Sequence, residues 1–139
     1  TLIGKQPAFT LDGEILLTQK DVRELQLAKA AMAAGIRLLC AELGHSIDDI
    51  RHIRIAGAFG NYLTPRSACR IGLLPQTLLA RIEGIGNAAG EGVKRVLRDP
   101  DAWAGANDLA FGTRFLELAT RADFQDCFVD ELAFGGTEA

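Results

Sequence analysis

Cysteine and histidine are scarce in this sequence, and their spacing excludes several kinds of site. The three cysteines, Cys40, Cys69 and Cys127, are odd in number and far apart, and no C-x-x-C pair occurs. This usage indicates buried thiols in a reducing cytoplasm rather than a disulfide framework. The two histidines, His45 and His52, have no further metal-type residue at zinc-finger spacing. We therefore expect no metal site.

Long apolar runs and an excess of positive charge are also missing. No apolar run approaches the roughly 20 residues of a membrane helix, and the net charge of −3 gives no general attraction to nucleic acid or acidic membranes. The first residues, TLIGKQPAF, lack a basic region followed by an apolar core, so we expect no secretory signal. They also lack Met, and we expect the chain to be part of a longer protein.

What is present fits one compact α/β domain. The 139 residues are 48% hydrophobic and 24% charged, which is ordinary for a globular protein. Residues 8–11 and 14–17 flank an Asp-Gly pair and predict a β-hairpin, although only the second run need be a strand. Thr18 and Asp21 form an acidic capping box, which predicts a helix from there to about Leu43, ended by Gly44.

Further elements follow from hydrophobic period and helix-start residues. The predicted strands lie at 52–57, at 81–85 and over Arg114–Leu118. The predicted helices are a short one within 65–73, one opened by GNAAGEG and ending near Arg98, and one beginning around Pro100. A last, amphipathic helix over 122–134 has Phe124, Phe128 and Leu132 on one face. Strands separated by helices predict a mixed, partly parallel sheet flanked by helices.

Two strands run into small residues, and this is where a ligand could bind. The stretches are IRIAGAFGN and IEGIGNAAGEG. Ligands of open α/β sheets bind beyond the carboxyl ends of the strands, and small residues allow close approach to the main chain. Neither stretch is a phosphate-binding P-loop or a dinucleotide fingerprint. The alternative is that both are packing turns.

No catalytic set emerges from the remaining polar residues. The two histidines lie near one predicted strand, and no Ser/His/Asp arrangement occurs, so we assign no catalytic residue. Polar residues crowd the first half of the long helix, namely Asp21, Arg23, Glu24, Gln26 and Lys29. Such a group usually forms a solvated face with local ion pairs. Because the rest of the helix is apolar, it could instead line a cleft.

Four blocks together resemble one family. They are LTQKDVRELQLAKAAMAAGI, AGAFGNYLTPRSACRIGLLP, GIGNAAGEG and DFQDCFVDELAF, and the resemblance covers roughly residues 14 to 134. The sequence resembles the C-terminal part of the reductive activators of corrinoid proteins. These are iron–sulfur proteins that spend ATP to reduce cob(II)alamin to cob(I)alamin.

The resemblance implies a fold and partners. The parent proteins carry a [2Fe–2S] ferredoxin-like domain, a linker, a middle domain and an ATPase domain of the actin, Hsp70 and sugar-kinase type. Residues 1–134 would be the second, ribonuclease-H-like half of that ATPase domain, and 135–139 a flexible tail. The implied partners are a corrinoid protein of a methyltransferase system and a second copy in a homodimer. No nucleic acid or membrane partner is implied, and the location would be cytoplasmic.

The resemblance also implies adenosine-binding residues at the first glycine turn. Gly57, Ala58 and Gly60 would allow close approach of adenine and ribose to the main chain. Asn61 would supply a polar contact. The superfamily usually has two glycines in tandem here, and Phe59 lies between the glycines of this chain. Phe59 would stack on adenine or fill the core.

Two more regions would complete the nucleotide contacts. Gly86, Asn87 and Gly90 occupy the next strand-to-helix turn. Gln26 and Lys29 lie on the helix before the adenosine strand, which contributes polar side chains to adenosine in some relatives.

ATP chemistry would be incomplete in this chain. Phosphate-binding turns and Mg²⁺ ligands belong to upstream sequence in the superfamily, so the chain would hold about half an ATP site and not hydrolyse ATP alone. The [2Fe–2S] cluster would belong to the parent only, because three scattered cysteines cannot supply four thiolates.

Two alternatives stay open. In one, the chain is a docking and dimerisation module that does not touch nucleotide, with the last helix and AAMAAG (residues 30–35) as interface surfaces. In the other, it serves a dehydratase, although such activators usually carry cluster-binding cysteines that this chain does not mimic.

Overall fold

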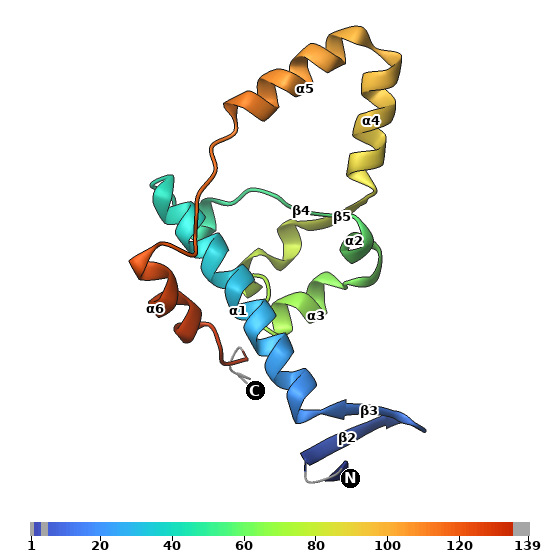
Figure 1. Cartoon of the computed structure of the whole chain (residues 1–139), viewed down its shortest axis with the longest axis vertical. Helices are drawn as coiled ribbons and strands as arrows, with labels where there is room; N and C mark the ends of the chain where they lie inside the picture. The colour runs from blue at the N-terminus through green and yellow to red at the C-terminus, as the bar shows by residue number, and fades with distance from the viewer. Residues whose placement is uncertain (1, 4–5, 135–139) are drawn as a thin grey trace.

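The computed structural model describes residues 2–3 and 6–134, and the predicted tail at 135–139 lies outside them. Within this part, the strands form two separate sheets, one of three strands and one of two (Figure 1). The three-stranded sheet is antiparallel and the two-stranded sheet is parallel. The predicted α/β class with a partly parallel arrangement is confirmed, but the strands do not join into one sheet.

The antiparallel sheet contains the predicted hairpin. Its strands are β1 (Leu2–Ile3), β2 (Gln6–Asp12) and β3 (Ile15–Thr18). Phe9 pairs with Leu17, and Gly13 takes a positive φ of 49° in the turn. Glycine suits this turn because it has no Cβ to resist the left-handed conformation.

Helix α1 (Gln19–Glu42) begins and ends where the sequence predicts. The Thr18 hydroxyl accepts a hydrogen bond from Asp21 N at 3.2 Å, and Thr18 N donates to Asp21 Oδ2 at 2.8 Å. Hydrogen bonds from Thr18 also lower the pKa of the Asp21 carboxyl. At the other end Gly44 has a φ of +70°. The capping box and the glycine stop are thus confirmed.

The core lies on one face of the parallel pair, β4 (Ile53–Ala56) and β5 (Ile82–Gly86). Alternation along the strands turns Ile53, Ile55 and Ile82 to the same side. They pack with Ile36 of α1 and with a buried cluster of Ala68, Cys69 and Leu74. The elements that supply or frame this core are η1 (Ile47–Asp49), α2 (Ala58–Tyr62), α3 (Pro65–Arg70) and η2 (Gln76–Arg81).

The opposite face of the parallel pair is polar. Arg54 of β4 and Glu83 of β5 are paired in register, and Arg54 Nε lies 2.7 Å from Glu83 Oε1. This hydrogen bond lowers the pKa of the Glu83 carboxyl. Both side chains are more than half exposed. Only one face of the sheet is therefore covered by the described residues.

Two helices project from the rest of the structure, and we call this pair the elbow (residues 88–112; Figure 1). They are α4 (Ala88–Arg98) and α5 (Pro100–Gly112), and the first turn of each is capped by the side chain of the residue before it. Asn87 Oδ1 accepts from Gly90 N at 3.0 Å, and Asp99 Oδ1 accepts from Asp101 N at 3.0 Å. Neither helix has a buried residue.

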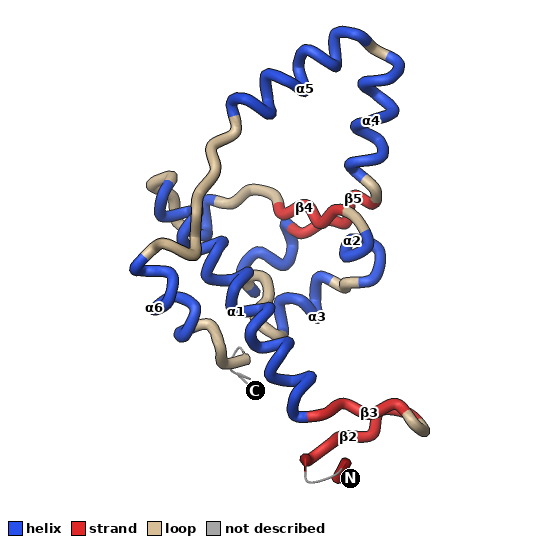
Figure 2. Tube along the Cα trace, in the orientation of Figure 1, coloured by secondary structure: helices blue, strands red, loops and turns tan. Residues whose placement is uncertain are grey.

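The strand predicted over Arg114–Leu118 is wrong. This segment is a loop that descends from α5 to α6 (Ala122–Asp130; Figure 2). A strand needs a hydrogen-bonded neighbour, and no strand among the described residues pairs with it. Its end packs on a helix instead, since a Cβ built on Gly35 of α1 would lie 3.4 Å from Leu118 Cδ1.

Helix α6 is shorter than predicted. It ends at Asp130, so Leu132 lies beyond it, while Phe124 and Phe128 are in ring contact as their spacing predicts. Among the described helices, none is long and apolar enough to cross a membrane.

Candidate functional site

Two glycine turns lie side by side at the carboxyl ends of β4 and β5. Gly57 directly follows β4, and Gly86 is the last residue of β5. Their φ values are positive, +74° and +61°. Gly57 N donates a hydrogen bond to Gly86 O at 2.7 Å. Each turn leads directly into a helix, α2 after Gly57 and α4 after Gly86. The two stretches picked from the sequence therefore form one continuous surface.

This surface is open at both glycines. A Cβ built on Gly57 or Gly86 would meet no other group within 4 Å. A side chain there would be strained by the positive φ, although space exists for it. The main chain is thus bare toward solvent, which is the condition for a flat ligand to approach it closely.

Gly60 has a different role, because α2 sits directly on the sheet. A Cβ on Gly60 would press against the Ile55 carbonyl oxygen, well inside van der Waals distance. A Cβ on Gly84 would lie 2.6 Å from Gly60 O. The close approach at Gly60 is therefore to the protein's own backbone, as the packing-turn alternative holds. The two closed glycines fix α2 beside the open turn.

Gly90 also serves the protein's own structure. A Cβ at this position would lie 2.5 Å from Asn87 Nδ2 and would displace the side chain that caps α4. Ala58, Asn61 and Asn87 are exposed. The side chain of Phe59 lies outside the described part of the structure.

Gln26 and Lys29 are not brought to the glycine turns. Lys29 is only 1% exposed, and its Nζ donates to Ala133 O. Gln26 Nε2 donates to Leu132 O at 3.2 Å. These carbonyls follow α6, which lies on the other side of α1 from α2 and β5 (Figure 1). Both side chains therefore hold the segment just after α6 on α1, and they do not make the predicted contact with adenosine at the glycine turns.

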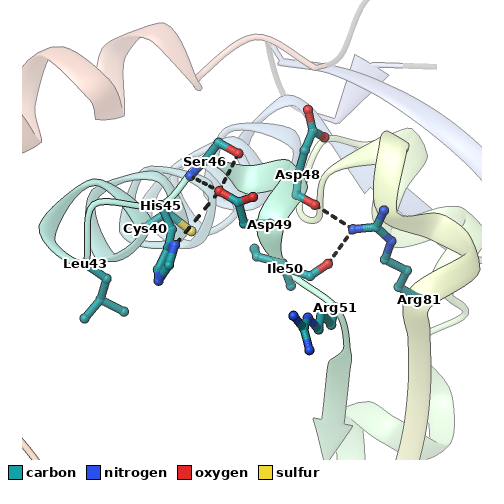
Figure 3. A pocket seen from close by; sticks show the side chains of 9 residues that line it. All are labelled: Cys40, Leu43, His45, Ser46, Asp48, Asp49, Ile50, Arg51 and Arg81. Carbon is teal, nitrogen blue, oxygen red and sulfur yellow. Dashed lines mark hydrogen bonds and ion pairs between the residues drawn. The ribbon is translucent and has the colours of Figure 1, made fainter.

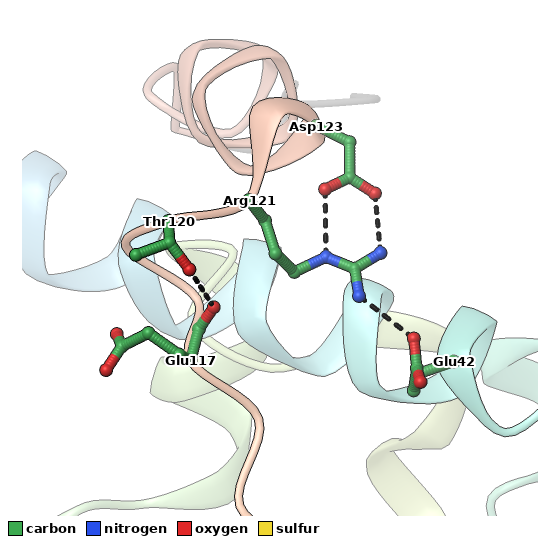
Figure 4. A network of polar contacts seen from close by, with 5 residues as sticks. All are labelled: Glu42, Glu117, Thr120, Arg121 and Asp123. Carbon is green, nitrogen blue, oxygen red and sulfur yellow. Dashed lines mark hydrogen bonds and ion pairs between the residues drawn. The ribbon is translucent and has the colours of Figure 1, made fainter.

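An ion-pair cluster that the sequence reading missed also holds α6 on α1 (Figure 4). Arg121 Nε and Nη2 donate to the two carboxylate oxygens of Asp123 at 2.9 and 2.8 Å, and Arg121 Nη1 donates to Glu42 Oε2 at 2.9 Å. The Arg121 guanidinium lowers the pKa of Asp123, and the two carboxylates raise the pKa of Arg121. The sequence signal for this cluster was an arginine and an aspartate, Arg121 and Asp123, two positions apart at the start of a predicted helix.

The surfaces proposed for docking from the sequence are partly covered. Within residues 30–35, Ala30, Ala34 and Gly35 are buried. Phe124 and Phe128 of α6 are half-buried, and Arg37 of α1 pairs with Glu131 at 3.0 Å. Part of the proposed interface is therefore used by α1 and α6 to pack on each other, while Met32 and Val129 stay exposed, and docking through these segments stays a prediction.

A hollow of about 780 Å³ lies at the amino ends of the strands (Figure 3). Arg81, just before β5, donates from Nη1 to Asp48 O at 2.7 Å and to Ile50 O at 2.6 Å. Hydrogen bonds from Ser46 lower the pKa of Asp49. These polar groups are engaged in holding the turn before β4, away from the glycine surface.

No residues of the described part gather as a metal site. No three histidine, cysteine, aspartate or glutamate side chains there lie close enough to hold an ion. Cys40, Cys69 and Cys127 are free, and burial raises the pKa of the Cys69 thiol. The donor set does not fit an iron–sulfur cluster.

Comparison with known proteins settles the family. Residues 2–139 match the family described as the C-terminal domain of RACo, the ASKHA domain. This chain belongs to that family. It is 40% identical over 122 residues to the corrinoid activation enzyme RamQ of Eubacterium limosum, an alignment that covers 88% of the chain and 21% of RamQ.

A solved structure agrees with this RACo-type assignment. The chain superposes with a TM-score of 0.79 and 33% identity on a reductive activator for corrinoid, iron-sulfur protein. The match covers 89% of this chain and 20% of that one. The resemblance and the ASKHA-type fold are confirmed, and the chain spans about a fifth of the length of these relatives.

Proposed function

We propose that this chain is the nucleotide-binding half-domain of an ATP-dependent reductive activator, which helps reduce cob(II)alamin to cob(I)alamin in a corrinoid methyl-transfer protein. The paired open turn of Gly57 and Gly86 is the observation that carries this proposal. RACo-type family membership and the printed roles of the relatives support the corrinoid part.

The turn suits a purine for three reasons. It lies at the carboxyl edge of parallel strands, where ligands of α/β sheets bind. It offers bare main chain on two adjacent strands, so a flat ring can lie against both. Its rim carries the small Ala58 and the amides of Asn61 and Asn87, and these neutral groups match adenosine better than phosphate.

The phosphates and Mg²⁺ would be held elsewhere. The described residues form no cluster of acidic side chains able to hold a metal ion, and phosphoryl transfer depends on such clamping. We therefore expect the chain alone to bind nucleotide weakly and not to hydrolyse it. Its free cysteines suit a cytoplasmic protein, and the [2Fe–2S] cluster of the proposed parent would lie outside this chain.

Nucleotide would act through conformational populations. It can favour the complex that reduces cobalt only by as much as its affinities for the two states differ. The proposed partner is a corrinoid protein, and the corresponding assay is reduction of its cob(II)alamin followed by absorbance, with and without ATP.

The test of nucleotide binding compares Gly57→Asn with Gly44→Asn. Both glycines have positive φ, +74° and +70°, and both have open space at Cβ, so backbone strain is matched. Asn tolerates this conformation better than other side chains. A fluorescent ATP analogue is titrated against the chain and against the longest polypeptide that carries it. We expect Gly57→Asn to weaken binding at least about tenfold, or ~1.4 kcal/mol.

Gly44→Asn should leave the affinity unchanged, because Gly44 follows the far end of α1. Equal affinities for the two variants, with wild-type circular dichroism, would overturn the proposed adenosine surface.

A second candidate function is docking without nucleotide contact. The exposed apolar residues of the elbow favour it, since no described element covers them.

A further inference from the structure

Charge is divided unevenly along this chain, although the net charge is only −3. The segment 51–98, which we call the basic segment, carries eight arginines and lysines and only two acidic residues, Glu83 and Glu91. The segment 99–134, which we call the acidic segment, carries eight acidic residues and only two basic ones, Arg114 and Arg121. An asymmetry of this kind indicates a surface that selects its partner by charge.

The fold keeps these two segments apart on either side of α1. The basic segment forms β4 and β5 and the helices α2, α3 and α4, and the acidic segment forms α5 and α6. Helix α6 lies on the other side of α1 from α2 and β5 (Figure 1). A protein that approaches the side of α2 and α3 therefore meets mainly positive charge.

Five of the eight cations in the basic segment are not used inside the protein. Arg54 pairs with Glu83 at 2.7 Å. Lys94 pairs with Glu91 at 2.7 Å, and Arg81 donates to two backbone carbonyls. The other five are exposed, and their side chains form no ion pair or hydrogen bond with any residue that the structure describes: Arg51, Arg66, Arg70, Arg95 and Arg98.

Two of these free arginines, Arg66 and Arg70, lie on the exposed side of α3, whose other side buries Ala68 and Cys69. They are four residues apart, and like charges at this spacing destabilise a helix. Arg66 is also in the first turn of α3, where the helix dipole disfavours a positive charge. The stability of the helix therefore does not explain Arg66, which indicates a role in binding something outside the chain.

Tyr62 adds an aromatic side chain shortly before this arginine pair. It is the last residue of α2 and is 87% exposed. Gly60 holds α2 against the sheet, and a step of two residues turns Tyr62 by about 200°, away from the sheet. Tyrosine and arginine are the residue types that often dominate protein–protein contacts. The three side chains therefore suit a protein partner.

We propose that the surface of Tyr62, Arg66 and Arg70 is the docking site for an acidic patch on the corrinoid protein. This inference rests on the corrinoid part of the proposed function and does not depend on nucleotide binding. Arginine holds a carboxylate through two parallel hydrogen bonds, so aspartates and glutamates are the expected contacts. The acidic segment repels a long polyanion, which favours a compact protein surface over nucleic acid.

Association kinetics test this proposal. The probe is the purified corrinoid protein whose cob(II)alamin is reduced by the longest polypeptide that carries this chain, and stopped-flow fluorescence follows the binding of the two proteins. The association rate constant should fall as salt is added, because ions screen the attraction. Arg66→Glu should lower this rate constant about tenfold at low salt and weaken its salt dependence. Arg66→Lys keeps the charge and should retain most of the wild-type rate.

Arg23→Glu is the matched control. Arg23 is likewise an exposed helical arginine that forms no ion pair with a described residue, but it lies in α1. The change in charge is the same, and the association rate should stay at the wild-type value. Arg66→Glu should fold at least as stably as the wild type, because a negative charge is favourable in the first turn of α3.

Three results would overturn the inference. They are equal association rates for Arg66→Glu and Arg23→Glu, a loss of affinity for the ATP analogue in Arg66→Glu, and binding of poly-U RNA by the wild type as tight as that of the corrinoid protein. Wild-type protein that neither reduces nor binds a corrinoid protein would overturn the proposed function as well. Normal wild-type binding without an effect at Arg66 would overturn the docking site alone.

Discussion

Two regions, the core around β4 and β5 and the elbow, use similar helix caps, but the core helix is partly buried and the elbow helices are exposed. Helix α3 in the core has Thr64 as its N-cap and Pro65 as its first residue. Helix α5 in the elbow has Asp99 as its N-cap and Pro100 as its first residue. Yet α3 buries Ala68 and Cys69, whereas the elbow helices bury nothing. Capping and helix propensity thus define a helix without deciding what it packs against.

The same contrast holds for glycine. Gly60 in the core has no room for a methyl group, because α2 rests on the sheet at that point. Gly92 in the elbow has open space around the same position. Identical residues are therefore required in one region and replaceable in the other.

Truncating one leucine in each region gives the largest expected difference. Leu78 is 1% exposed, and Leu78→Ala should lower the free energy of unfolding by roughly 2–5 kcal/mol through lost burial and a cavity. Leu97→Ala should change it by less than about 0.5 kcal/mol, because Leu97 is exposed. Urea unfolding followed by circular dichroism measures both. Comparable losses for the two variants would mean that the elbow folds back onto the body in solution.

Adding a methyl group to one glycine in each region is the next test. Gly60→Ala forces its Cβ against the Ile55 carbonyl and should cost roughly 1–3 kcal/mol. Gly92→Ala, within α4, should instead stabilise by up to about 1 kcal/mol, since alanine is the better helix former. Thermal melts distinguish the signs. A destabilising Gly92→Ala would show that another surface covers α4.

Acid gives the smallest effect, at the surface contact between α6 and α1. The folded-state pKa of Asp123 lies below its ordinary value because of Arg121. Its stabilising contribution is therefore complete above about pH 4 and is lost as pH falls through the lowered pKa. Amide NMR signals of α6 should shift in that acidic range, while those of Ala68 and Cys69 in α3, a helix that carries no carboxylate, stay in place.

Asp123→Asn is the control for the acid experiment. At neutral pH its α6 signals should already resemble those of the acidified wild type, because Arg121 keeps only Glu42 as a charged partner. Wild-type α6 signals in this variant would show that the Asp123 carboxylate does not hold the helix.

Most of the elements could be predicted from the sequence because their signals are local. The capping box at Thr18 and Asp21, the turn at Gly13 and the cap at Asn87 each act within three residues or so. The Arg114–Leu118 strand was wrong because alternation is also produced by a loop whose side chains pack on a helix. Period alone does not supply a pairing partner.

The candidate site was only partly predictable. Sequence located the two turns that come together at Gly57 and Gly86, since both follow predicted strands. It gave no means of separating these open glycines from Gly60, which packs on backbone. The resemblance also offered Lys29 as a contact to adenosine, although its side chain is buried and donates to Ala133 O, just after α6.

By itself, the sequence determined most of the helices and strands and the RACo-type family, because these depend on neighbours along the chain and on the order of motifs. Tertiary structure alone decided which glycines face open space and which helices remain exposed. It also decided which polar side chains bond to backbone carbonyls distant in sequence. The physical reason is that a contact between segments a hundred residues apart depends on how whole elements pack, and no local pattern records that packing.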